Sequence, residues 1–91
     1  MYKEVGYFDE DYKIVKRLSY CKGILITIHE YNPNDETLLS KKTEYVDDKI
    51  IITQYDESPM AIHEKETFKN NELIEKIFFN EGYLSSINRS A

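Results

Sequence analysis

Apolar and polar residues alternate along most of the chain, and short polar breaks separate the alternating stretches. A period of two over about four to eight residues is typical of β-strands with one half-buried face. The breaks are rich in Asp, Asn, Gly and Pro, which favour tight turns. The pattern predicts strands at residues 1–8, 12–20, 24–31, 38–46, 49–55, 61–68, 72–79 and 83–88.

Three of these strands, at residues 24–31, 49–55 and 72–79, carry aliphatic side chains on both faces. Strict alternation places Leu25 on the face opposite Ile28, and Leu73 on the face opposite Phe78. Strands that are apolar on both faces are usually covered on both sides. We therefore expect something to cover the second face of the sheet, namely its own curl, a dimer mate or a partner protein.

Aromatic residues recur at a constant interval of 24 residues, at Tyr7, Tyr31, Tyr55 and Phe79. The same step relates Ile14, Leu38 and Ile62, and also Ile26, Ile50 and Ile74. A period of about 20 to 50 residues indicates a repeat architecture, and here each repeat contains two strands and two turns. Residues 1–91 are predicted to form a single all-β domain, an antiparallel up-and-down meander of about eight short strands in four two-stranded repeats. The sheet either stays open and twisted or closes into a small barrel.

Residues 64–79 also allow a second, helical interpretation, because they contain good helix formers. A helical wheel can be drawn through Phe68, Glu72, Ile74 and Phe78. The break at Lys69-Asn70-Asn71 and the step of 24 residues to Phe79 favour two strands instead. Asn is among the few residues that tolerate a left-handed backbone, so this break predicts a tight turn.

Composition narrows the classes of function. The 91 residues carry a net charge of -5, which disfavours direct nucleic-acid binding and favours a basic partner. Eight of the twelve aromatic residues are Tyr, and these suit a thin fold with half-exposed rings. No apolar run approaches the ~18 residues of a membrane span, and the start of the chain lacks the apolar run of a signal peptide. A cytoplasmic location without membrane contact is expected.

His29, His63 and Cys21 are the residues to weigh for chemistry. Each histidine lies in an Ile-His-Glu triplet, which would suit acid–base chemistry or metal binding. However, no His-x-x-x-His or Cys-x-x-Cys spacing supports a metal, and polar strand residues are the simplest interpretation. Cys21 lies in a predicted turn, has no disulfide partner and lacks an activating motif. We expect no enzyme, no catalytic residue, no metal and no cofactor.

The segment Phe78-Phe79-Asn80-Glu81-Gly82-Tyr83-Leu84 resembles the aromatic-aromatic-x-x-Gly-x-Leu step of bacterial MORN-like antitoxin repeats. It is also similar to the Tyr-Asp-x-x-Gly-x-Leu step of YD (RHS) repeats, whose Tyr-Asp pair is supplied by Tyr55-Asp56. The period covers residues 7–88, and the last copy keeps both Gly82 and Leu84. The resemblance implies a β-meander used for scaffolding and protein contacts, in proteins often associated with toxin–antitoxin or toxin–immunity pairs.

These observations favour a non-enzymatic, acidic protein-binding module, most concretely an immunity- or antitoxin-type inhibitor. It would occlude the basic active site of a toxin such as a nuclease, with aromatic anchors and with carboxylates in place of substrate phosphates. The candidate contact residues are Tyr31, Asp35, Tyr55, Asp56, Glu57 and Tyr83. The alternative is a structural β-repeat module that self-associates, for example as a homodimer, through sheet edges or faces.

Overall fold

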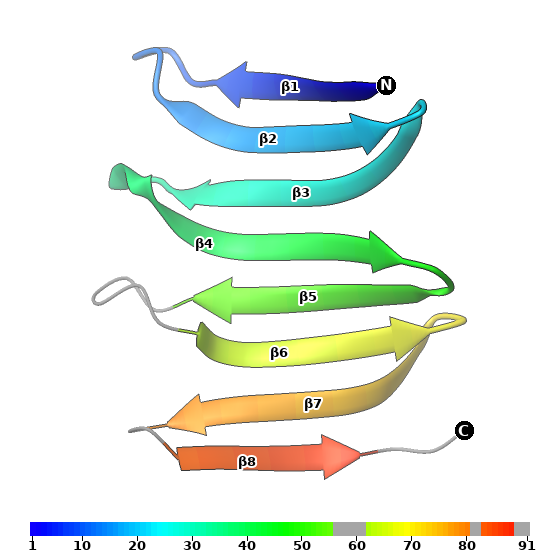
Figure 1. The fold of residues 1–91 in the computed structure, drawn as a ribbon. Coiled ribbons are helices and arrows are strands. Elements are labelled where there is room, and N and C mark those ends of the chain that lie inside the picture. Colours follow the sequence, from blue (N-terminus) through cyan, green and yellow to red (C-terminus); the bar gives the residue numbers. More distant parts are fainter. Residues whose placement is uncertain (56–61, 81–82, 89–91) are drawn as a thin grey trace.

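The computed structural model describes residues 1–55, 62–80 and 83–88, with the backbone alone for residues 80 and 83–88. It contains eight strands, β1 (Tyr2–Phe8), β2 (Ile14–Cys21), β3 (Ile24–Asn32), β4 (Asp35–Val46), β5 (Lys49–Tyr55), β6 (Ile62–Lys69), β7 (Glu72–Asn80) and β8 (Tyr83–Asn88). They form one antiparallel sheet in the order β1 to β8, so every strand pairs with its neighbours in the chain (Figure 1). This confirms the predicted all-β meander. The sheet is open, with β1 and β8 at its two edges.

The stretch with the competing helical interpretation is a β-hairpin of β6 and β7. Asn70 and Asn71, between the two strands, have φ values of 53° and 65°. Two consecutive positive φ values match a type I′ turn, whose twist suits the right-handed twist of the flanking strands. Lys22 (φ 53°) and Gly23 (φ 78°) form the equivalent turn between β2 and β3. Cys21 was predicted to lie in this turn, but it is the last residue of β2.

The connection between β1 and β2 is longer than predicted, because Asp9 organises a turn around its own side chain. Its Oδ1 accepts hydrogen bonds from the backbone N–H groups of Asp11 (2.9 Å) and Lys13 (3.0 Å). Tyr12, predicted to begin the second strand, lies in this turn with a φ of 63° and 88% of its surface exposed. The strand begins at Ile14 instead.

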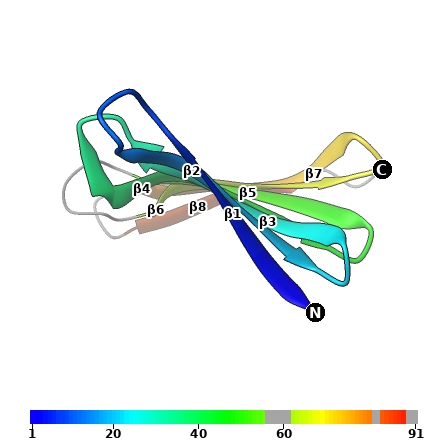
Figure 2. The same ribbon diagram turned by 90° about the horizontal axis from the view of Figure 1, so that it is seen from above.

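Five of the seven strand pairings contain a shift in register. The residues inserted singly are Val15, Ile26, Ser40, His63 and Ile74, and a second shift in the pairing of β3 with β4 inserts residues 36–38. Such β-bulges bend a strand and increase the local right-handed twist, and the sheet is visibly twisted when seen from above (Figure 2).

The bulges also overturn part of the strict alternation predicted from the sequence. Because Ile26 is inserted, Leu25 pairs with Tyr20 and shares the face of Ile28. Because Ile74 is inserted, Leu73 pairs with Phe68 and shares the face of Phe78. Both leucines were predicted on the opposite face. A bulge moves every residue beyond it to the other side, which a period of two cannot anticipate.

The two faces of the sheet differ in chemistry. One, here called the apolar face, carries a row that crosses β1 to β5 and contains Val5, Leu18, Ile28, Thr43 and Ile52. A second row lies beside it and contains Tyr20, Leu25, Tyr45, Ile50, Phe68 and Leu73. The other, here called the polar face, carries a row of Arg17, His29, Lys42, Thr53 and Lys65.

Among the described residues, no second layer covers either face and no apolar side chain is buried. The Cα atoms extend over 42 × 35 × 18 Å, as expected for one twisted sheet. The buried side chains are short and polar, among them Ser19 (2% exposed), Thr53 (3%) and Thr67 (9%). Short side chains become buried in an open sheet because longer neighbours on the same face cover them, and such cross-strand contacts stabilise sheets.

The left-handed turn between β6 and β7 gives a test of the fold. Asn71→Ala should lower the free energy of unfolding by about 1 kcal/mol, because a side chain without a local polar partner is disfavoured at positive φ. Urea unfolding followed by circular dichroism would measure the change. Asn34→Ala is the matched control, because Asn34 lies in a turn without a positive φ. Equal losses in the two variants would contradict the turn geometry.

Candidate protein-binding surface

A strip of large apolar side chains lies on the polar face, at the end of the sheet where β1, β3, β5 and β7 terminate (left in Figure 1). This aromatic strip consists of Phe8, Ile14, Tyr31, Leu39, Tyr55, Ile62 and Phe79. Phe8 pairs with Ile14, Tyr31 with Leu39, and Tyr55 with Ile62. Phe8 is 60% exposed and Ile62 is 37% exposed, so the strip is accessible from solvent.

The strip follows the 24-residue repeat with two departures. Tyr31, Tyr55 and Phe79 belong to it, but Tyr7 pairs with Lys16 on the apolar face, and Phe8 takes its place. The ring of Phe8 lies close to Gly6 on the polar face. A Cβ atom added at Gly6 would lie only 3.3 Å from this ring.

In the second repeat, Leu39 replaces Leu38, which the period had selected. The cause is the bulge at Ser40, whose insertion gives Tyr31 the partner Leu39. The hydroxyl group of Ser40 donates a hydrogen bond to the backbone carbonyl of Glu30 (3.1 Å). The bulge therefore decides which leucine joins the strip.

Exposed carboxylates border the aromatic strip at the same end of the sheet. This acidic margin consists of Asp9, Glu10, Asp11, Asp35 and Glu36. Oε2 of Glu36 accepts a hydrogen bond from the backbone N–H of Ile14 at 2.8 Å. This bond joins the start of β2 to the start of β4 across the end of β3, and so fixes the margin against the strip.

Two local hydrogen bonds stabilise the ionised form of Asp35. Its Oδ1 accepts one from the Thr37 hydroxyl (2.6 Å) and one from the Thr37 backbone N–H (3.0 Å). These bonds, the hydroxyl first, lower the pKa of Asp35 below its ordinary value. The hydrogen bonds therefore favour the ionised form of this carboxyl group.

The structure brings together three of the six residues predicted to contact a partner. Tyr31 and Tyr55 lie in the aromatic strip, and Asp35 lies in the acidic margin. Tyr83 is the first residue of β8, but its side chain lies outside the described part of the chain, and Asp56 and Glu57 lie outside the described residues altogether.

Several members of this surface were missed from the sequence. Leu39 joins the strip because of the bulge at Ser40, and Phe8 joins it because it lies one residue beyond Tyr7, the position that the 24-residue period selects. Neither cause leaves a signal in the hydrophobic pattern of the sequence. Glu36 was missed because its role depends on a contact with Ile14, 22 residues away in the chain.

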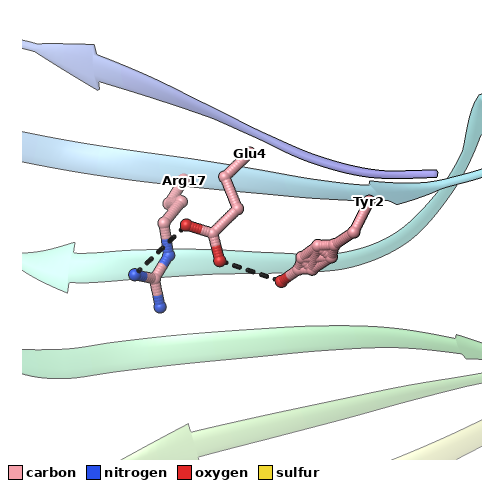
Figure 3. A network of polar contacts seen from close by, with 3 residues as sticks. All are labelled: Tyr2, Glu4 and Arg17. Atoms are coloured by element: carbon pink, nitrogen blue, oxygen red, sulfur yellow. Dashed lines mark hydrogen bonds and ion pairs between the residues drawn. The ribbon is translucent and has the colours of Figure 1, made fainter.

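Polar contacts also connect β1 and β2 on the rest of the polar face. Glu4 accepts a hydrogen bond from the hydroxyl of Tyr2 (2.8 Å), and its other oxygen lies 3.9 Å from the Arg17 guanidinium (Figure 3). This network ties β1 to β2. Its groups are partly exposed, so each contact adds little to stability.

His29 lies between Arg17 and Lys42 in the register of the polar face. Partial burial and then the charges of Arg17 and Lys42 lower the pKa of His29, against the opposite effect of Glu4 and Glu44. The lowered pKa favours the neutral imidazole at pH 7, and its Nδ1 atom has no hydrogen-bond partner among the described residues.

The other candidates for chemistry lie elsewhere. His63 is the inserted residue of the bulge in β6, and Cys21 is exposed at the end of β2. The described residues contain no group of three or more His, Cys, Asp or Glu side chains able to hold a metal ion. That part of the chain also has no helix long and apolar enough to cross a membrane.

Comparison with known proteins gives no relative to guide the interpretation. No family model matches the chain, and neither a curated protein nor a solved structure matches it.

Removing single charges near His29 should shift its pKa in opposite directions. Lys42→Gln should raise the pKa of His29, because a cation is removed, and Glu44→Gln should lower it, because an anion is removed. Titration of the His29 ring by NMR would measure both, and shifts of the same sign would contradict the arrangement of the polar face.

The same pKa shift predicts how stability depends on pH. Because the folded-state pKa of His29 lies below its ordinary value of 6.5, the unfolded chain binds the proton more readily. The folded state should therefore lose stability as the pH falls below 6.5. The loss should be smaller in a His29→Gln variant, as measured by urea unfolding at several pH values. An identical pH dependence in the variant would contradict this assignment.

Proposed function

We propose that this protein is a non-enzymatic protein-binding module, an inhibitor of the immunity or antitoxin type that occludes the basic active site of a toxin such as a nuclease. The observation that carries the proposal is the aromatic strip beside the acidic margin, at one end of a thin sheet. Large apolar side chains and fixed negative charges are thereby presented to one partner.

The aromatic strip supplies the anchors of the interface. Tyrosine is enriched at binding hot spots because it buries a large ring while its hydroxyl group stays able to bond. Tyr31 and Tyr55 are only partly buried within the sheet, and so they keep surface that a partner can cover. Their positions at the ends of hydrogen-bonded strands limit the entropy lost on binding.

The acidic margin supplies the electrostatic part of the interface. None of its five carboxylates forms an ion pair within the described residues. They are free to meet the cationic side chains that hold phosphate groups in a nuclease cleft. Complementary charge of this kind raises the association rate and makes it sensitive to salt.

A second function, that of a self-associating structural module, is favoured by a different observation, the uncovered apolar face. The two functions use opposite faces of the sheet and are separable by experiment. Loss of partner binding on changing the aromatic strip supports the inhibitor, whereas association that depends only on the apolar face supports the structural module.

The first experiment identifies the partner from the proposed surface. A photo-crosslinking amino acid replaces Tyr31 in one variant and Tyr2, which is at the other end of the polar face, in a second. Both are expressed in the native host, and crosslinked proteins are identified by mass spectrometry. We expect a basic protein to be crosslinked from position 31 and not from position 2. Equal labelling from both positions would contradict the assignment of the surface.

Substitutions then test the two parts of the surface with the identified partner. Tyr31→Ala should weaken binding by about 30-fold, the effect of losing a hot spot, whereas Tyr2→Ala should leave affinity unchanged. Asp35→Lys combined with Glu36→Lys should slow association and reduce its salt dependence. Isothermal titration and stopped-flow measurements at two salt concentrations give these values. Unchanged binding by the double variant would refute the electrostatic part.

A further inference from the structure

The apolar face is the largest feature that the proposed function leaves unexplained. Leu18, Ile28 and Ile52 lie side by side at its centre, and Ile50 and Phe68 lie beside them. None of these side chains is buried. Contiguous apolar patches larger than a few hundred Å² are rare on monomeric proteins and mark interaction sites.

The size of this face fits a second sheet. The two longer dimensions of the molecule, 42 and 35 Å, exceed what a standard interface of ~800 Å² per partner requires. Two sheets pack stably face to face when their strands are nearly aligned, and their side chains then form a core about 10 Å thick. A second copy of this chain supplies a sheet with the same dimensions and the same twist.

The charges beside the apolar rows are self-complementary. The next row of the apolar face lies toward the end of the sheet that carries the aromatic strip on its other side. It contains, across β2 to β6, Lys16, Glu30, Lys41, Gln54 and Glu64. It holds two positive and two negative charges, and so it has no excess charge that would select an acidic or a basic partner. Lys41 and Glu30 already approach each other within one sheet, at 3.9 Å.

We propose that the apolar face binds a second copy of this chain in a twofold symmetric sandwich, with the axis parallel to the strands and between β3 and β4. Rotation about this axis reverses the strand order of the second sheet. Each row of one copy then lies above the same row of the other copy. Across β2 to β5, apolar residues then cover apolar residues, for example Leu18 of each copy above Ile52 of the other, and Glu30 of each copy lies above Lys41 of the other. The four charges at the axis alternate in sign, as an isologous interface requires.

The sandwich leaves the polar face of each copy on the outside. Both aromatic strips therefore stay accessible, so the dimer is compatible with the proposed binding function and does not depend on it. The two acidic margins lie at the same end of the sandwich, where their repulsion is screened beyond a Debye length of ~8 Å at physiological salt.

Charge exchange between copies tests this geometry without altering the apolar core. Glu30→Lys places Lys above Lys41 of the other copy, and Lys41→Glu places Glu above Glu30 of the other copy. Each variant alone should dissociate at a concentration at least ~10-fold higher than the wild type does. In an equimolar mixture of the two variants, opposite charges meet again across the axis, and heterodimers should form. Mass in solution is measured by sedimentation and light scattering.

Lys65→Glu is the matched control, because it makes the same change of charge on the polar face; it should dimerise like the wild type. Circular dichroism confirms that the variants are folded. A wild-type protein that stays monomeric at several hundred micromolar would overturn the proposal. So would a mixture no more dimeric than its two components, or variants that both dimerise like the wild type. None of these results would affect crosslinking from position 31, so the dimer and the inhibitor function fail or succeed separately.

Discussion

Backbone hydrogen bonding between strands that follow one another in the chain is the interaction on which this structure depends. Every strand pairs only with its sequence neighbours, and no helix or second sheet packs on the described residues. In such a single layer, cross-strand side-chain pairs replace a hydrophobic core as the source of packing. This is why four of the five buried residues are Ser or Thr shielded by longer neighbours, the fifth being Asn32, while the large apolar residues stay partly exposed.

The β-bulges give the two faces of the sheet their different characters. At Ile26 and Ile74 they add Leu25 and Leu73 to the apolar face, and at Ser40 they bring Leu39 into the aromatic strip. A simple alternating sheet would have spread these apolar side chains over both sides. The bulges instead gather two adjacent apolar rows on one face and place the aromatic strip at one end of the other, where Ile24, Ile51 and Ile77 are apolar residues outside the strip.

This separation lets one thin domain offer two surfaces of different kinds. The apolar face is broad and nearly neutral, which suits a copy of itself. The aromatic strip is narrow and bordered by carboxylates that the sheet does not neutralise, which suits a basic partner. The hydrogen bond from the Ile14 backbone N–H to Glu36 connects β2 to β4 at the end of the sheet that carries the acidic margin. The aromatic strip and the acidic margin therefore form one surface.

The sequence by itself determined the strands, their order and most of their turns, because alternation, the 24-residue period and the Asn70-Asn71 turn act locally along the chain. It also selected Tyr31, Tyr55 and Asp35, which the fold gathers at one end. Only the tertiary structure decided the open sheet, the start of β2 after Tyr12, and the faces of Tyr7, Leu25 and Leu39. The physical reason is that register and bulges arise between strands, where a pairing shifted by one residue reverses a face without changing the local pattern.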